Sequence, residues 1–111
     1  MTKQEFKELV AKGKVVLDGA TGSNLMKAGM PRGVCTESWV IEHKDVIQDL
    51  QKAYIEAGSN IIYAPTFGGN RVNLTMHGLE GQIEEINHTL AGYTREIAPA
   101  GVYVAGDITT T

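Results

Sequence analysis

Three apolar segments recur along the chain, and each ends in small and polar residues. They read KVVLDGATG from Lys14, NIIYAPTFGG from Asn60 and VYVAGDITTT from Val102. Counted from residues 15, 60 and 102, their starts lie 45 and 42 residues apart, which leaves room for helices between them. Their apolar runs do not alternate with polar residues, as is typical of strands covered on both faces in a parallel sheet. The pattern predicts about three parallel strands.

Apolar residues at helical spacing fill the intervals between these segments. The capping-box motif TKQE at residues 2–5 predicts a first helix that ends near Gly13. The clearest apolar stripe predicts a helix over about residues 43–57, and a second long stripe predicts one near residues 80–97. We expect shorter helical turns in SNLMKAG and NRVNLTMHG, and a polar loop over residues 29–39.

This order of elements predicts an α/β fold, which is either a small open domain or the opening portion of a longer barrel. The sequence ends on GDITTT directly after the third predicted strand, with no helix to cover that strand. A complete (β/α)8 barrel needs about 250 residues. We therefore expect the 111 residues to form at most the first few units of such a barrel.

Composition narrows the classes of function. The chain is 42% hydrophobic and 21% charged, as expected for one globular unit, and its net charge of -3 argues against nucleic-acid binding, which needs a basic surface. No apolar run approaches the roughly 20 residues of a membrane helix, and the N-terminus is amphipathic rather than a signal peptide. We therefore expect no membrane contact and a cytoplasmic location. The glycosylation patterns at Asn73 and Asn87 are interpreted as chance matches.

Polar residues follow each predicted strand. Asp18, Thr66 and Asp107 stand at the three strand ends, and the carboxyl ends of parallel strands meet at the edge of a sheet where ligands bind. A carboxylate at Asp18 suits an ammonium group, while the backbone N–H groups of the small residues after it suit a carboxylate. Those small residues are Gly19, Ala20 and Thr21. The pattern indicates an amino-acid site, and the alternative is that Asp18 only caps the next short helix.

The segment APTFGGN adds further candidates. It places Thr66 and Phe67 at the end of the second strand and Asn70 at the start of the next helix, where an asparagine commonly serves as the N-cap. On spacing alone, Phe67 is interpreted as a packing residue rather than a ligand contact. Trp39 is expected to anchor its loop on the core. Neither GATG nor FGGN matches GxGxxG, so we expect no phosphate loop.

The cysteine and the three histidines give little indication of a catalytic or metal-binding role. Cys35 is the only cysteine, which excludes an internal disulfide, and it has no paired cysteine or obvious histidine partner that would indicate a metal ligand or nucleophile. The three histidines are interpreted as surface or capping residues.

Taken in order, the motifs LDGATGSNL, ESWVIEHKDVIQDLQKAYIEAGSNIIYAPTFGGNRVNLTMHGL and VAGDI resemble the N-terminal part of the homocysteine S-methyltransferase family. The resemblance is strongest to the homocysteine-binding module of cobalamin-dependent methionine synthase, and it runs from about Val15 to Ile108. It implies a (β/α)8 TIM barrel in which homocysteine binds at the C-terminal rim and its sulfur binds Zn2+ as a thiolate. The methyl donor in the family is methylcobalamin, betaine or S-methylmethionine, with cobalamin carried on another domain or protein.

Carried over residue by residue, the resemblance implies that Asp18 and the backbone of Gly19, Ala20 and Thr21 contact the amino-acid end of homocysteine. It also implies that Thr66, Phe67 and Asn70 lie beside the pocket.

Two features of this sequence depart from the family pattern. The family holds zinc with three cysteines that come later in the barrel, and Cys35 lies in the wrong region to replace them. The third-strand motif usually continues as Gly-Pro-Thr, whereas Asp107 is followed in this chain by ITTT. We therefore expect residues 1–111 to be an N-terminal fragment of the domain that is inactive alone and partners the remainder of the barrel. The alternative is a non-catalytic amino-acid-binding or assembly module that pairs through its open sheet with another copy of the chain.

Overall fold

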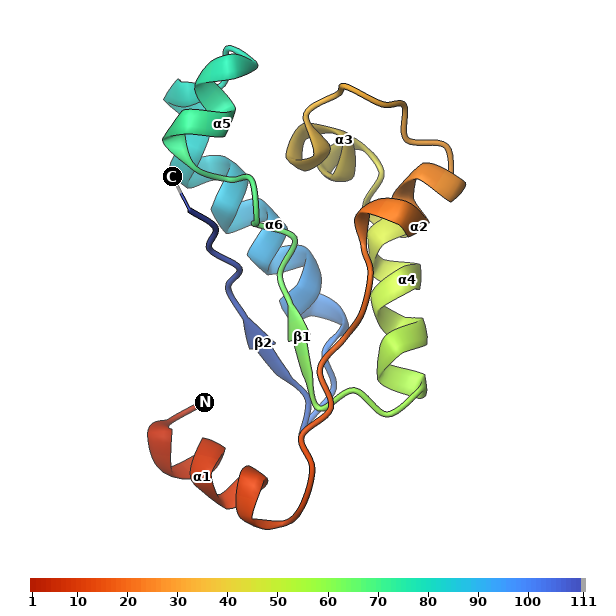
Figure 1. The fold of residues 1–111 in the computed structure, drawn as a ribbon, viewed down its shortest axis with the longest axis vertical. Coiled ribbons are helices and arrows are strands. Elements are labelled where there is room, and N and C mark those ends of the chain that lie inside the picture. The colour runs from red at the N-terminus through yellow and green to blue at the C-terminus, as the bar shows by residue number, and fades with distance from the viewer. Residues whose placement is uncertain (111) are drawn as a thin grey trace.

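A two-stranded parallel sheet lies at the centre of the protein, and two long helices pack against it (Figure 1). The structure is a computed structural model that describes residues 1–110. Strand β1 (Ile61–Tyr63) pairs with β2 (Tyr103–Ala105), with Ile61 opposite Tyr103. The helices are α1 (Lys3–Ala11), α2 (Gly22–Lys27), α3 (Thr36–Glu42), α4 (Lys44–Glu56), α5 (Arg71–Met76), the short 3-10 helix η1 (Glu80–Gln82) and α6 (Ile83–Ile97).

The segment predicted as the first strand runs beside β1 but forms only one parallel bridge, between Leu17 and Ile61. The Val16 carbonyl accepts the Asn60 N–H at 2.7 Å and the Ile61 N–H at 3.3 Å, but side chains occupy other positions of the ladder. The Val16 N–H donates to Asn60 Oδ1 at 2.8 Å, and the Tyr63 N–H donates to Asp18 Oδ2 at 3.2 Å. The structure therefore has two strands where about three were expected, because two polar side chains compete with backbone carbonyls for the same donors.

The helix predictions hold except in one place. Thr2 and Glu5 form the expected capping box at α1, and α4 and α6 lie within the two long predicted helices. The predicted loop over residues 29–39 is wrong in its second half, because α3 begins at Thr36. This short helix buries Glu37 and Val40. Packing against the core, rather than a long apolar stripe, stabilises it.

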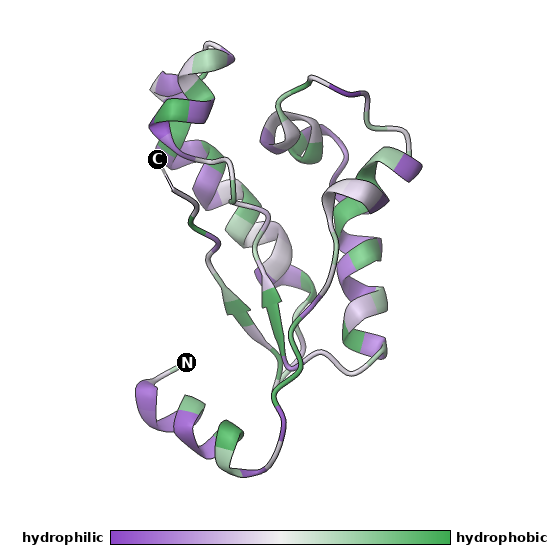
Figure 2. Ribbon diagram, in the orientation of Figure 1, coloured by the Kyte–Doolittle hydropathy of each residue, from purple (hydrophilic) through white to green (hydrophobic). Residues whose placement is uncertain are grey.

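The apolar core lies among helices α2 to α6. Its buried members are Leu25, Cys35, Val40, Ile47, Leu74, Ile86 and Leu90. Trp39 packs against this cluster, which confirms its role as an anchor, and its ring stacks on His43 with centroids 3.7 Å apart. Figure 2 shows apolar and polar residues alternating around the helices. Helix α1 lies apart from the core, and Phe6 and Val10 remain about half exposed.

A buried polar chain joins α6, α4 and β1. The Thr94 hydroxyl donates to Gln51 Oε1 at 3.0 Å, and Gln51 Nε2 donates to the Tyr63 carbonyl at 3.1 Å. Thr94 is 0% exposed and Gln51 is 3% exposed. This chain holds the carboxyl end of β1 against the helices. Within residues 1–110, no helix combines the length and the apolar character needed to cross a membrane.

Candidate functional site

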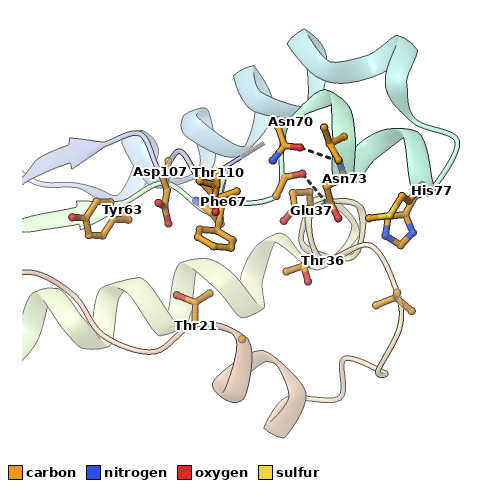
Figure 3. Close-up of a pocket in the computed structure, with 18 of the residues that line it drawn as sticks. Thr21, Thr36, Glu37, Tyr63, Phe67, Asn70, Asn73, His77, Asp107 and Thr110 are labelled. Carbon is orange, nitrogen blue, oxygen red and sulfur yellow. Dashed lines mark hydrogen bonds between the residues drawn. The ribbon is translucent and has the colours of Figure 1, made fainter.

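An open cavity of about 640 Å³ lies at the carboxyl ends of the strands (Figure 3). Tyr63 reaches it from β1, Ala64 from the residue directly after β1, and Asp107 from the segment after β2. Helices α3 and α5 and the segment after Leu17 form its other walls. Figure 3 shows Thr21 across the cavity from Phe67. The sequence predicted a ligand site at this edge of the sheet, and the structure has a cavity there.

Four of the seven residues proposed from the sequence line this cavity: Gly19, Thr21, Phe67 and Asn70. The other three do not line it, and each takes part in a hydrogen bond between neighbouring segments. Asp18 accepts the Tyr63 N–H of β1. The Ala20 carbonyl accepts the Tyr54 hydroxyl at 2.7 Å. The Thr66 hydroxyl donates to the Asp107 carbonyl and accepts the Asp107 N–H, both at 3.0 Å.

The surroundings of Asp18 raise the pKa of its carboxyl group above the ordinary value. Burial is the main cause, and the negative charge of Asp107 adds to it, while the hydrogen bond from the Tyr63 N–H acts in the opposite direction. Asp18 bonds to the last residue of β1, and Tyr63 and Asp107 both line the cavity, so Asp18 and Asp107 lie at the same end of the sheet. It does not cap α2, because the N-cap of that helix is Thr21 and no side chain bonds to the cap. The alternative interpretation of Asp18 as a helix cap is wrong.

Gly19 permits a close approach between two segments. A Cβ atom at this position would lie 3.0 Å from the Tyr54 ring and from its hydroxyl oxygen. The tyrosine could not then bond to the Ala20 carbonyl without moving. The small residue after Asp18 thus shapes the cavity wall through its size.

The role predicted from the sequence is wrong for Phe67 and correct for Asn70. Phe67 is 59% exposed and lines the cavity, so its interpretation as a packing residue is wrong. Asn70 is the N-cap of α5, as expected, and its Oδ1 accepts the Asn73 N–H at 2.9 Å.

Glu37 is a cavity residue that the sequence did not indicate. It is 4% exposed, and its Oε1 accepts Asn73 Nδ2 at 3.2 Å and the Cys35 thiol at 3.9 Å (Figure 3). Burial raises the pKa of this carboxyl group, although its own backbone, the Gly68 backbone, His77 and Cys35 all favour the charged form. The apolar pattern does not mark Glu37, because its burial depends on a helix that this pattern does not predict; the one signal is that the family motif ESWVIEHK begins at this residue.

The cavity does not supply the metal ligands that the family resemblance implies. Among residues 1–110, no three His, Cys, Asp or Glu side chains are grouped so that they could hold a metal ion. Cys35 is buried, and its thiol faces Glu37. The residues present therefore do not fit a zinc site.

Polar groups around an open cavity at the carboxyl ends of parallel strands are typical of α/β enzymes. The sequence matches the family model for homocysteine S-methyltransferase over residues 15–111. It is 33% identical to S-methylmethionine–homocysteine S-methyltransferase of Pongo abelii over 98% of this chain and 30% of that protein. It is 29% identical to methionine synthase of Mycobacterium leprae over 82% of this chain and 8% of that protein.

The fold has a similar counterpart among solved structures. The homocysteine methyltransferase MmuM from Escherichia coli, in its metallated form, matches with a TM-score of 0.78 and 20% identity, over 93% of this chain and 40% of that one.

The protein belongs to the homocysteine S-methyltransferase family. It spans less than a third of the length of these two curated relatives and two fifths of the MmuM chain. The family resemblance is thereby confirmed. The narrower assignment to the methionine synthase type stays a prediction, because the S-methylmethionine enzyme matches at higher identity than methionine synthase does.

Proposed function

We propose that this protein takes part in transferring a methyl group to the thiol of homocysteine, giving methionine. In this proposal, residues 1–111 are the N-terminal part of the homocysteine-binding domain and form one wall of its pocket. Family membership supports the reaction class. The observation that carries the proposal is the hollow rim where Asp18 bonds to the end of β1 beside Asp107.

The charges of the rim favour a ligand with an ammonium group. Among the described residues, no lysine or arginine lines the cavity, whereas Glu37 and Asp107 do. Burial and Asp107 both disfavour the charged form of Asp18, and an incoming ammonium group would offset both effects. We assign the ammonium group of homocysteine to Asp18.

The other predicted contacts complete the proposed pocket. Backbone N–H groups of Gly19, Ala20 and Thr21 bind the ligand carboxylate, and Thr66, Phe67 and Asn70 form the facing side. The small side chains after Asp18 let a ligand approach the backbone closely.

The chemical step needs the thiolate of homocysteine, which is the nucleophilic form. In the family, bound Zn2+ supplies that form, and methylcobalamin, betaine or S-methylmethionine supplies the methyl group. The residues of this chain bind and orient the amino-acid end of the substrate. We propose that the isolated 111-residue chain does not carry out the transfer.

The free edge of β2 is the proposed contact with further parts of the barrel. Within the described residues, β2 pairs only with β1. Its other edge therefore presents N–H and C=O groups that a further strand can pair with. The competing proposal is that a second copy of the chain pairs at this edge. Sedimentation velocity distinguishes the two proposals, because only the second expects the isolated chain to sediment as a dimer.

The binding proposal is tested by titrating L-homocysteine into the protein in a calorimeter. Asp18→Ala removes a charge-assisted contact worth about 1.5 to 3 kcal/mol, so its affinity should fall roughly 10- to 150-fold. Asp49→Ala, which removes an exposed acid on α4, is the matched control and should bind like the wild type. Equal affinities for Asp18→Ala and the wild type would refute the role given to Asp18.

A second measurement tests the expected lack of turnover. The chain is incubated with zinc, homocysteine and each of the three methyl donors, and methionine is measured by mass spectrometry. We expect none above the protein-free background. Methionine formation together with stoichiometric zinc binding by the isolated chain would overturn this part of the proposal.

A further inference from the structure

The turn over residues 66–70 is held by side chains from two different helices. Asn73 Nδ2 of α5 donates to the Gly68 carbonyl at 2.8 Å, and Asn87 Nδ2 of α6 donates to the Gly69 carbonyl at 2.7 Å. Within the turn, the Gly69 N–H donates to the Thr66 carbonyl at 3.0 Å. Two successive backbone carbonyls thus each accept a separate side-chain amide.

Both side-chain amides are fixed by a second bond. Asn73 Nδ2 also donates to Glu37 Oε1 at 3.2 Å, and Asn87 Nδ2 also donates to the Ile83 carbonyl at 2.7 Å. A primary amide has two N–H donors. Each asparagine therefore uses both of its donors, and Glu37 sets the orientation of Asn73.

The glycine pair in this turn is explained by these contacts rather than by backbone conformation. Neither Gly68 nor Gly69 has a positive φ. A Cβ atom on Gly68 would lie 2.5 Å from Glu37 Oε1, and one on Gly69 would lie 2.6 Å from Asn87 Oδ1. Glycine at both positions leaves the space that the carboxylate and the amide occupy.

The held turn carries residues of the candidate pocket. Phe67 and Asn70 both line the cavity, and Phe67 is 59% exposed. An aromatic ring this exposed gains little orientation from packing, so its position depends on the backbone that carries it. That backbone is held by the bonds to the neighbouring glycines.

We propose that Glu37, Asn73 and Asn87 are positioning residues that hold the 66–70 turn rigid and so present Phe67 and Asn70 to the ligand. None of the three is given a chemical role. The ligand part rests on the proposed function, whereas the rigidity of the turn can be measured in the free protein.

The experiment measures amide hydrogen exchange by NMR in the free protein and L-homocysteine affinity by calorimetry. Asn87→Ala and Glu37→Ala should each speed exchange at the Gly69 amide roughly tenfold, as expected for loss of one hydrogen bond, with little change in α4. Glu37→Gln keeps an oxygen that can accept Asn73 Nδ2 and should exchange like the wild type. His88→Ala on α6 and Glu42→Ala on α3 are the matched controls.

The outcomes separate this inference from the proposed function. Faster Gly69 exchange with weaker homocysteine binding supports the inference. Unchanged exchange in Asn87→Ala and Glu37→Ala overturns it, and so does faster exchange with unchanged affinity. If the wild type does not bind homocysteine, the proposed binding function fails by itself, and the exchange rates still decide whether these residues hold the turn.

A compensating pair gives an independent check that does not require Glu37→Ala to fold. Gly69→Ala should speed exchange in the turn, because the new methyl group meets the Asn87 amide. In the Asn87→Ala background that space is free, so adding Gly69→Ala should have little further effect. Equal effects of Gly69→Ala in both backgrounds would contradict the proposed contact.

Discussion

The buried chain from Thr94 through Gln51 to the Tyr63 carbonyl allows a quantitative prediction about what holds the rim in place. Thr94→Val keeps the shape of the side chain but removes the hydroxyl that donates to Gln51 Oε1 at 3.0 Å. With Gln51 only 3% exposed, water cannot readily replace that donor. We expect the free energy of unfolding to fall by about 1 to 3 kcal/mol, the usual cost of leaving a buried polar group unpaired.

The second substitution removes the centre of the chain. Gln51→Leu takes away the donor to the Tyr63 carbonyl, 3.1 Å distant, and the acceptor for Thr94. Its cost should equal or exceed that of Thr94→Val, again about 1 to 3 kcal/mol for each group left unpaired. The double variant removes both members of the Thr94–Gln51 bond. It should therefore be less destabilised than the sum of the single variants, by about 1 kcal/mol.

Urea denaturation followed by circular dichroism measures all four proteins of this cycle. Thr89→Val, on the same helix, is the matched control, because no hydrogen bond of the Thr89 hydroxyl is seen within the described residues. It should change the stability by less than about 0.5 kcal/mol. The reasoning is refuted if the two single effects add to the double effect within about 0.3 kcal/mol, since additivity is the behaviour of independent sites.

Two further predictions concern the cavity wall. Asn70→Ala removes the side chain that caps α5 by accepting the Asn73 N–H, and it should cost about 1 kcal/mol in urea denaturation, whereas Asn70→Asp should retain most of the stability. Because burial raises the pKa of Glu37 above its ordinary 4.5, its stabilising contribution is full below pH 4.5 and is lost as pH rises through the folded pKa. The stability of Glu37→Gln relative to the wild type should therefore increase between pH 4 and pH 7, and a constant or falling difference in urea midpoints would contradict this sign.

Local signals in the sequence are strong enough to predict the main helices. The apolar stripes of α4 and α6 and the capping box of α1 depend only on residues within one helix, so they can be recognised without the fold. Helix α3 has no such stripe in its seven residues, and its position depends on Cys35 and Val40 reaching the core. The apolar pattern therefore does not predict it.

Strand pairing is harder to predict than strand position. The three segments lie side by side as expected, but Asn60 and Asp18 side chains take up donors that a third strand would have used. The sequence contains both residues, yet nothing local shows that their oxygens reach a neighbouring segment. Whether a side-chain oxygen or a backbone carbonyl accepts a given N–H depends on which of them the fold brings within hydrogen-bond distance.

For the candidate site, the sequence alone determined that polar groups follow the ends of apolar segments, and therefore that Asp18, Thr66 and Asp107 gather on one rim. Only the tertiary structure decided which groups line the cavity: Asp18 and Thr66 bond to neighbouring strand ends beside it, whereas Phe67 stands exposed within it. The burial of Glu37 and the approach of two asparagine amides to a glycine pair also depend on helices distant in the chain. Spacing along a sequence sets which end of a strand a residue occupies, whereas burial and hydrogen bonding depend on which segments pack around it.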